Sequence, residues 1–97
     1  MKKILLISRH EIILASLLNH LYNNGFDALG ARRDAEAVSF IKSFKPDLVI
    51  LAGDFEFVEQ EELMAQLNEC QPNMFIFSYR GGVKDLMERV NYYFKKH

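Results

Sequence analysis

The stretch Lys45-Pro46-Asp47-Leu48-Val49-Ile50-Leu51 decides the fold class of this chain. Its proline ends the helical pattern before it, because the proline ring cannot continue a helix. The apolar run after the aspartate is typical of a strand in a parallel sheet that is buried on both faces. We therefore expect a central strand at Asp47–Leu51, with Ala52, Gly53 and Asp54 at its carboxyl end.

Similar patterns alternate on both sides of this strand. Apolar runs predict three more strands, at Ile4–Ile7, Phe26–Ala31 and Met74–Phe77. Apolar residues at helical spacing predict four helices: one from Ile13 to a cap at Asn23–Gly25, one from an N-cap at Asp34 to Phe44, one over Glu59–Glu69, and one that Gly81–Gly82 opens and that ends at Lys95–Lys96.

Strands that alternate with helices through short connections form right-handed crossovers and a parallel sheet with helices on both faces. The predicted fold class is therefore α/β, a small doubly wound parallel sheet of four strands in the order 2-1-3-4. Ligands of such sheets bind beyond the carboxyl ends of the strands, where the strand order reverses. That place lies between Ser8–His10 and Ala52–Asp54.

Length and composition fit one globular domain spanning residues 1–97. Twelve basic and thirteen acidic residues give a net charge of −1, which provides no general attraction for nucleic acid or an anionic membrane. Cys70 is the single cysteine, so no internal disulfide can form, and no apolar run approaches the about 20 residues that span a bilayer. We expect a cytoplasmic protein that binds neither nucleic acid nor membrane.

Several segments, in this order and at these spacings, resemble the receiver domains of two-component response regulators. The segments are Lys3–Ile7, Leu17–Phe26, Ala35–Ala37, Lys45–Leu51 and Phe77–Ser78. The resemblance covers most of the chain, and Lys45–Leu51 is its most specific part. It implies a flavodoxin-like (CheY-like) fold and a role in signal transduction.

The phosphorylation chemistry of receivers needs an acidic pair after the first strand, to hold Mg²⁺, and an aspartate after the third strand, to accept the phosphoryl group. By the resemblance, Ser8 and Arg9 stand at the acidic pair and Ala52 stands at the acceptor. Ser78 matches the hydroxyl residue that the family carries after its fourth strand. The sequence therefore predicts a pseudo-receiver with no catalytic residue, no metal site and no cofactor.

Asp54 lies two residues beyond the acceptor position and has three interpretations. It is a displaced acceptor, or an ion-pair partner of Arg9, or an ordinary solvated loop carboxylate. A similar choice holds for Gly81–Gly82, which form either a phosphate cradle before the last helix or a tight turn; we favour the turn, because the spacing of a phosphate loop is missing.

The chain is also shorter than a typical receiver. In our preferred alignment it lacks the fourth helix and the fifth strand, because Pro72 and Ser78 then fall where the family has them. The alternative alignment makes Phe75–Arg80 the fifth strand and removes the preceding unit, with Arg80 in place of the family's lysine.

This shortening predicts an apolar sheet edge that soluble proteins rarely leave open. We expect an interface with a second copy or a signalling partner, unless loops or the last helix cover the edge. Aromatic side chains of the last helix are suited to such a contact. The predicted interface residues are Met74, Phe75, Ile76, Phe77, Tyr92, Tyr93 and Phe94.

The leading functional prediction is a non-enzymatic, phosphorylation-independent interaction module that acts as a homodimer or through a protein partner. The alternative is a small phosphate- or nucleotide-binding enzyme on the same fold. In that case Ser8, Arg9 and Ser78 would bind the anion.

Overall fold

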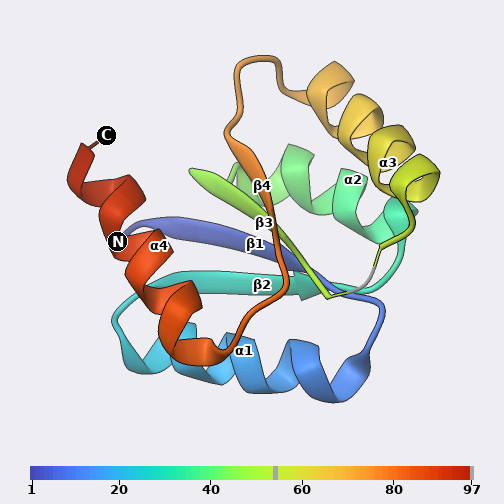
Figure 1. The fold of residues 1–97 in the computed structure, drawn as a ribbon. Helices are drawn as coiled ribbons and strands as arrows, with labels where there is room; N and C mark the ends of the chain where they lie inside the picture. The colour runs from blue at the N-terminus through green and yellow to red at the C-terminus, as the bar shows by residue number, and fades with distance from the viewer. Residues whose placement is uncertain (54, 97) are drawn as a thin grey trace.

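The computed structural model describes residues 1–53 and 55–96, which form a parallel sheet with helices on both faces (Figure 1). The sheet has four strands in the order β2-β1-β3-β4, which confirms the predicted fold class and strand order. In chain order the elements are β1 (Lys3–Ile7), α1 (Glu11–Asn23), β2 (Asp27–Ala31), α2 (Asp34–Phe44), β3 (Leu48–Ala52), α3 (Phe57–Cys70), β4 (Ile76–Tyr79) and α4 (Val83–Lys96).

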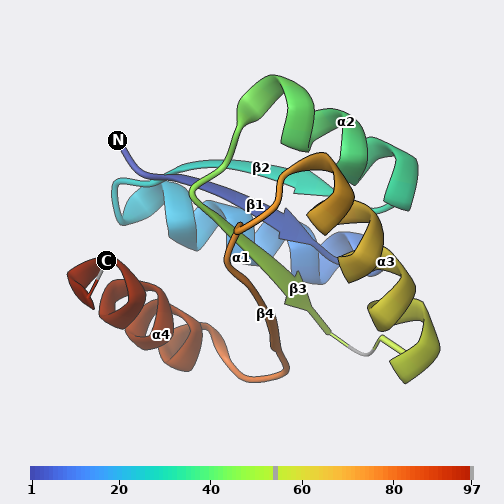
Figure 2. The ribbon, with the colours of Figure 1, turned by 90° about the horizontal axis from the view of Figure 1, so that it is seen from above.

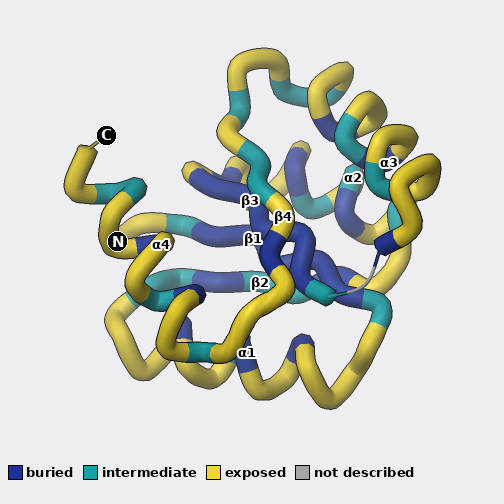
Figure 3. The backbone as a smooth tube through the Cα atoms, in the orientation of Figure 1, coloured by how far each residue is buried: buried dark blue, intermediate teal, exposed yellow. Residues whose placement is uncertain are grey.

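The two central strands are buried on both faces, as their unbroken apolar runs predict. Successive side chains of a strand point to opposite faces, so each strand contributes to two cores. Ile4 and Leu6 of β1 pack on one side of the sheet, and Leu5 and Ile7 pack on the other. The buried strands in Figure 3 thus separate two helical layers.

Helices α1 and α4 cover one face of the sheet, and α2 and α3 cover the other (Figure 2). The first layer buries leucines of α1 together with Leu86 and Val90 of α4. The second layer buries Ile41 of α2 with Leu63 and Leu67 of α3. Within the described part of the chain, every helix is too short or too polar to cross a bilayer.

Among the predicted boundaries, the starts of β4 and α3 are each wrong by two residues. Strand β4 begins at Ile76 instead of Met74, because the turn that ends at Asn73, with its φ of 71°, needs two further residues to bring the chain to the sheet. Helix α3 begins at Phe57 instead of Glu59. Its first turn closes early, since the N–H of Gln60 donates to the carbonyl of Glu56 at 2.9 Å.

The predicted N-cap at Asp34 is also wrong. Asp34 is the first helical residue of α2, and Arg33 occupies the cap position without a side-chain hydrogen bond to the helix. The carboxylate of Asp34 binds Arg9 instead. A contact between distant segments therefore takes the side chain that local preference assigns to capping.

Strand β4 lies at one side of the sheet and pairs with β3 (Figure 1). Its register sets Ala52 opposite Tyr79 and Val49 opposite Ile76. The turn after Tyr79 then leads the chain into α4, which returns along the face that α1 also covers. This arrangement creates two distinct surface regions, the carboxyl end of the sheet and the surface shared by β4 and α4.

Candidate functional site at the carboxyl end of the sheet and along β4 and α4

The chain leaves β1 through a tightly held turn at Ser8. Ser8 is fully buried, and its N–H donates to the carbonyl of Ala31 at 3.0 Å. The Ser8 hydroxyl oxygen accepts a hydrogen bond from the N–H of His10 at 3.3 Å. The serine is therefore a structural element of the turn, and its hydroxyl does not reach solvent.

Arg9, the next residue, extends across the carboxyl end of the sheet to the connection between β2 and α2. Its Nη2 donates to the Oδ1 of Asp34 at 2.5 Å, and its Nη1 donates to the carbonyl of Arg32 at 2.6 Å. Charge-assisted bonds of this length are about twice as strong as neutral ones. The guanidinium thus ties the loop after β1 to the loop after β2.

The same guanidinium also contacts the segment that follows β3. It lies 4.9 Å above the ring of Phe55, and its Nε is 3.8 Å from the Oε2 of Glu59. An arginine stays protonated at any ordinary pH. Arg9 therefore places a permanent positive charge among three loops, and two carboxylates already neutralise it.

The position that the resemblance assigns to the phosphoacceptor offers no oxygen. Ala52 is 2 % exposed and contributes a methyl group to the core. Gly53 follows with a φ of 99°, a conformation that favours glycine, and its N–H donates to the carbonyl of Tyr79 at 2.9 Å. Asp54 lies outside the described residues, so its proposed pairing with Arg9 stays a prediction.

The three residues predicted to bind an anion have different surroundings. Ser8 is buried, Arg9 is paired with carboxylates, and Ser78 is exposed on β4. In the described ranges, no cluster of three or more histidine, cysteine or acidic side chains has the arrangement of a metal site. At this end of the sheet, Arg9 and the Ser8 hydroxyl thus pair with other groups of the same chain.

Gly81 and Gly82 form the turn between β4 and α4. The hydroxyl of Tyr79 donates to the carbonyl of Gly82, which also accepts the N–H of Leu86 at 3.1 Å. A Cβ on Gly81 would lie 2.4 Å from the Tyr79 hydroxyl oxygen, so only glycine fits there without a shift. Burial raises the pKa of the Tyr79 phenol, and the negative charge of Asp85 raises it further.

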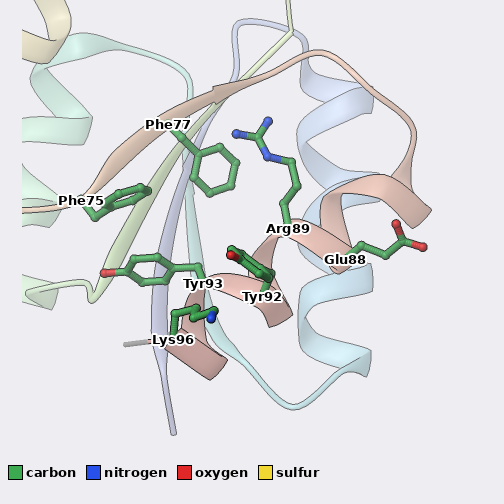
Figure 4. A pocket seen from close by; sticks show the side chains of 7 residues that line it. All are labelled: Phe75, Phe77, Glu88, Arg89, Tyr92, Tyr93 and Lys96. Carbon is green, nitrogen blue, oxygen red and sulfur yellow. The ribbon is translucent and has the colours of Figure 1, made fainter.

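An open groove runs between β4 and α4 (Figure 4). Its volume is about 800 Å³, and its lining is mainly apolar and aromatic. Two phenylalanines come from the β4 side and the remaining side chains come from α4. The lining residues are Phe75, Phe77, Glu88, Arg89, Tyr92, Tyr93 and Lys96.

Contacts inside this groove fix its walls. The rings of Phe75 and Tyr93 lie with their centroids 4.6 Å apart, and the guanidinium of Arg89 lies 4.2 Å above the ring of Phe77. Arg89 also donates to the carbonyl of Ser78 at 3.3 Å, so it links α4 to β4. Burial raises the pKa of the Tyr93 phenol, and the negative charge of Asp47 raises it further.

The structure divides the predicted interface residues into three sets. Phe75, Phe77, Tyr92 and Tyr93 gather in the groove. Met74 and Ile76 pack instead against the core below α2 and α3. Phe94 stacks on Phe26 with a centroid distance of 5.6 Å and belongs to the α1 and α4 layer.

Sequence reasoning missed several residues of both regions. Asp34 and Glu59 were not predicted as partners of Arg9, and no sequence signal marks them, since they lie in the first turns of α2 and α3, far from Arg9 along the chain. Glu88, Arg89 and Lys96 were not assigned to the aromatic surface. Their spacing relative to Tyr92 on α4 is the signal that would have found them.

Known structures resemble this fold over nearly its whole length. A CheY-like response-regulator receiver domain protein from Methanospirillum hungatei has a TM-score of 0.85 at 18 % identity, covering 99 % of this chain and 95 % of its own. A receiver-modulated diguanylate cyclase from Pelobacter carbinolicus has a TM-score of 0.74 at 20 % identity, covering 99 % and 98 %. The fold is that of a response-regulator receiver domain.

The receiver domain of NtrC4 from Aquifex aeolicus has a similar fold. Its TM-score to this chain is 0.64 at 24 % identity, covering 84 % of this chain and 68 % of that one. No family model matches this sequence, and no curated protein matches it. The solved structures therefore confirm the receiver fold that the resemblance, strongest in Lys45–Leu51, predicts.

Proposed function

We propose that residues 1–97 act as one receiver-like signalling module that binds protein partners without being phosphorylated and catalyses no reaction. The observation that carries this proposal is the position of Arg9. Its guanidinium contacts the loops after β1, β2 and β3, at the end of the sheet where receivers carry out their chemistry.

Arg9 opposes phosphorylation in two ways. A fixed positive charge repels Mg²⁺, which receivers need in order to stabilise the transferring phosphoryl group. The carboxylate of Asp34, which would attract the metal, already accepts a hydrogen bond from Arg9. With the methyl group of Ala52 at the acceptor position, neither the metal nor the phosphoryl group has its usual oxygen partners.

The alternative of a phosphate- or nucleotide-binding enzyme would need Arg9 to exchange its internal partners for a ligand. Ser8 would also have to release its hydroxyl from the turn that it holds. Both changes would break contacts that stabilise the loops. The interaction module needs neither change, and the groove between β4 and α4 offers it a surface.

Intact-mass spectrometry of the purified chain with Mg²⁺ and acetyl phosphate tests the proposal. We expect no phosphoryl adduct, and we expect the melting temperature to be the same with and without Mg²⁺. A receiver domain that has its full acidic set serves as the positive control in the same mixture.

The variant Asp54→Asn separates the two ways in which this expectation could fail. An adduct that forms on the wild type and disappears in Asp54→Asn would identify Asp54 as a displaced acceptor. An adduct that persists in the variant would place the acceptor elsewhere. Either result would contradict the proposed function.

A further inference from the structure

We propose that the groove between β4 and α4 binds a second copy of this chain, and that a two-fold axis beside Tyr92 relates the two copies. This inference rests on the proposed function, because it names the partner of the same interaction module. It follows from the shape of the surface, from the order of its charges and from the hydrogen bond by which Arg89 covers one carbonyl at the edge of β4.

The surface carries both parts of a self-complementary contact. Tyr92 lines the groove and is 64 % exposed, and Phe75 on the opposite wall is 45 % exposed. Exposed aromatic rings beside an apolar hollow are typical of interface centres. In a two-fold dimer the same patch meets itself, so Tyr92 of each copy enters the groove of the other.

The charges around Tyr92 favour one orientation of the second copy. Glu88, Tyr92 and Lys96 follow one another at intervals of four residues, and therefore share one stripe of α4. When two α4 helices meet antiparallel at Tyr92, Glu88 of one copy lies opposite Lys96 of the second copy, and the reverse pair forms as well. Each pair lies about 6 Å along the helix from the axis.

A parallel meeting would instead set each Glu88 against the other Glu88, and each Lys96 against the other Lys96. The helix dipole accounts for Lys96, which lies in the last turn of α4, but not for Glu88, because the effect falls off beyond the first and last turns. Glu88 is the sixth residue of α4, and so lies in the second turn. The order of charges is therefore complementary to its own antiparallel copy.

Arg89 restricts how the copies meet. The carbonyls of Phe75 and Tyr79 accept hydrogen bonds from Val49 of β3 and from Gly53 just after it. The carbonyl of Ser78, which points to the other side of β4, accepts one from Arg89. A covered carbonyl hinders the addition of another strand to this edge. The contact is thus made by side chains of the groove and α4, and it closes as a dimer.

Sedimentation equilibrium from about 1 to about 300 µM, a range that covers micromolar dissociation constants, tests this inference with four proteins: the wild type, Tyr92→Ala, Glu88→Lys and Lys96→Glu. We expect the wild type to dimerise. Tyr92→Ala removes the central anchor and weakens the dimer about 100-fold. Each charge reversal sets two like-charge pairs across the interface and weakens it about tenfold.

An equimolar mixture of Glu88→Lys with Lys96→Glu is the matched control. In a mixed dimer, opposite charges again face each other at both places, so association returns to within about threefold of the wild type. A loss of folding in either variant would not be repaired by mixing. Circular dichroism of each variant supplies the folding control.

A wild type that stays monomeric at the highest concentration would overturn the inference, and the groove would then belong to a different partner. Equal association of the wild type and both charge variants would also overturn it. Either result leaves the proposed function standing if the chain still ignores Mg²⁺ and acetyl phosphate. Phosphorylation of the chain would instead overturn the proposed function.

Discussion

The carboxyl end of the sheet and the groove between β4 and α4 use an arginine in different ways. Arg9 has carboxylate partners from two other segments, and it joins loops into one network. Arg89 lies on aromatic rings and covers one carbonyl, while Tyr92 beside it is largely exposed. The charge of Arg9 in the first region is neutralised by carboxylates of the same chain, whereas the second region presents apolar surface outward.

This difference predicts that one region stabilises the fold and that the other binds a partner. Internal pairing at the carboxyl end holds the loops in place without an external ligand. Exposed aromatic rings stabilise a monomer little, because they become buried only when a partner covers them. Substitutions in the first region should therefore change the free energy of unfolding, and substitutions in the second should change association.

The largest expected effect on stability comes from Arg9→Met. The variant leaves Asp34, Glu59 and the carbonyl of Arg32 without their cationic partner, and should lower the free energy of unfolding by about 2 kcal/mol. Urea denaturation measures this change. Arg33→Met, at an exposed arginine nearby, should change it by no more than about 0.5 kcal/mol. Equal effects of the two variants would contradict the role of Arg9.

A somewhat smaller effect is expected for Gly81→Ala. The new methyl group would meet the hydroxyl of Tyr79, which is held by the carbonyl of Gly82, so the turn before α4 must shift. We expect a loss of about 1.5 kcal/mol. Gly82→Ala is the control, because no atom lies within 4 Å of its added methyl group. A smaller loss in Gly81→Ala than in Gly82→Ala would contradict this packing.

The fold was predictable from the sequence where local patterns are strong. The apolar runs of β1 and β3 and the spacing of leucines in α1 report burial directly, and the alternation of strands with helices predicted the layers and the strand order. The start of β4 was not predictable, because it depends on how many residues the preceding turn uses.

The candidate site was only partly predictable. By the resemblance, Ser8, Arg9 and Ala52 stand where receivers carry carboxylates, and this much could be predicted from the sequence. The pairing of Arg9 with Asp34, 25 residues away, depends on how two loops meet in three dimensions. For the same reason the sequence could not separate Phe94, which stacks on Phe26, from Tyr92, which is exposed.

A pH titration tests the burial of the β4–α4 turn. The pKa of Tyr79 is raised in the folded chain, from a usual value of 10.0, so the unfolded chain loses this proton first. The contribution of the buried Tyr79 phenol to the free energy of unfolding should therefore be fully present below about pH 10. It should be lost as the pH rises further, through the pKa of Tyr79 in the folded chain. Tyr79→Phe should show a shallower fall in urea denaturation from about pH 9 to about pH 11. Identical slopes would contradict this burial.

The smallest expected effect on stability is that of Tyr92→Ala. Its side chain is mostly exposed, so at a concentration where sedimentation shows a monomer the free energy of unfolding should change by no more than about 0.5 kcal/mol. The same variant should nevertheless lose dimerisation. A loss of stability similar to that of Arg9→Met would mean that the groove supports the fold instead of a partner.

Sedimentation velocity of the wild-type chain, with and without Mg²⁺ and acetyl phosphate, tests the central claim most directly. We predict a dimer whose population rises with protein concentration and, at each concentration, is the same with and without Mg²⁺ and acetyl phosphate, as expected if Arg9 opposes phosphorylation. A chain that associates only when Mg²⁺ and the donor are both present would contradict this account and would restore phosphorylation as its switch.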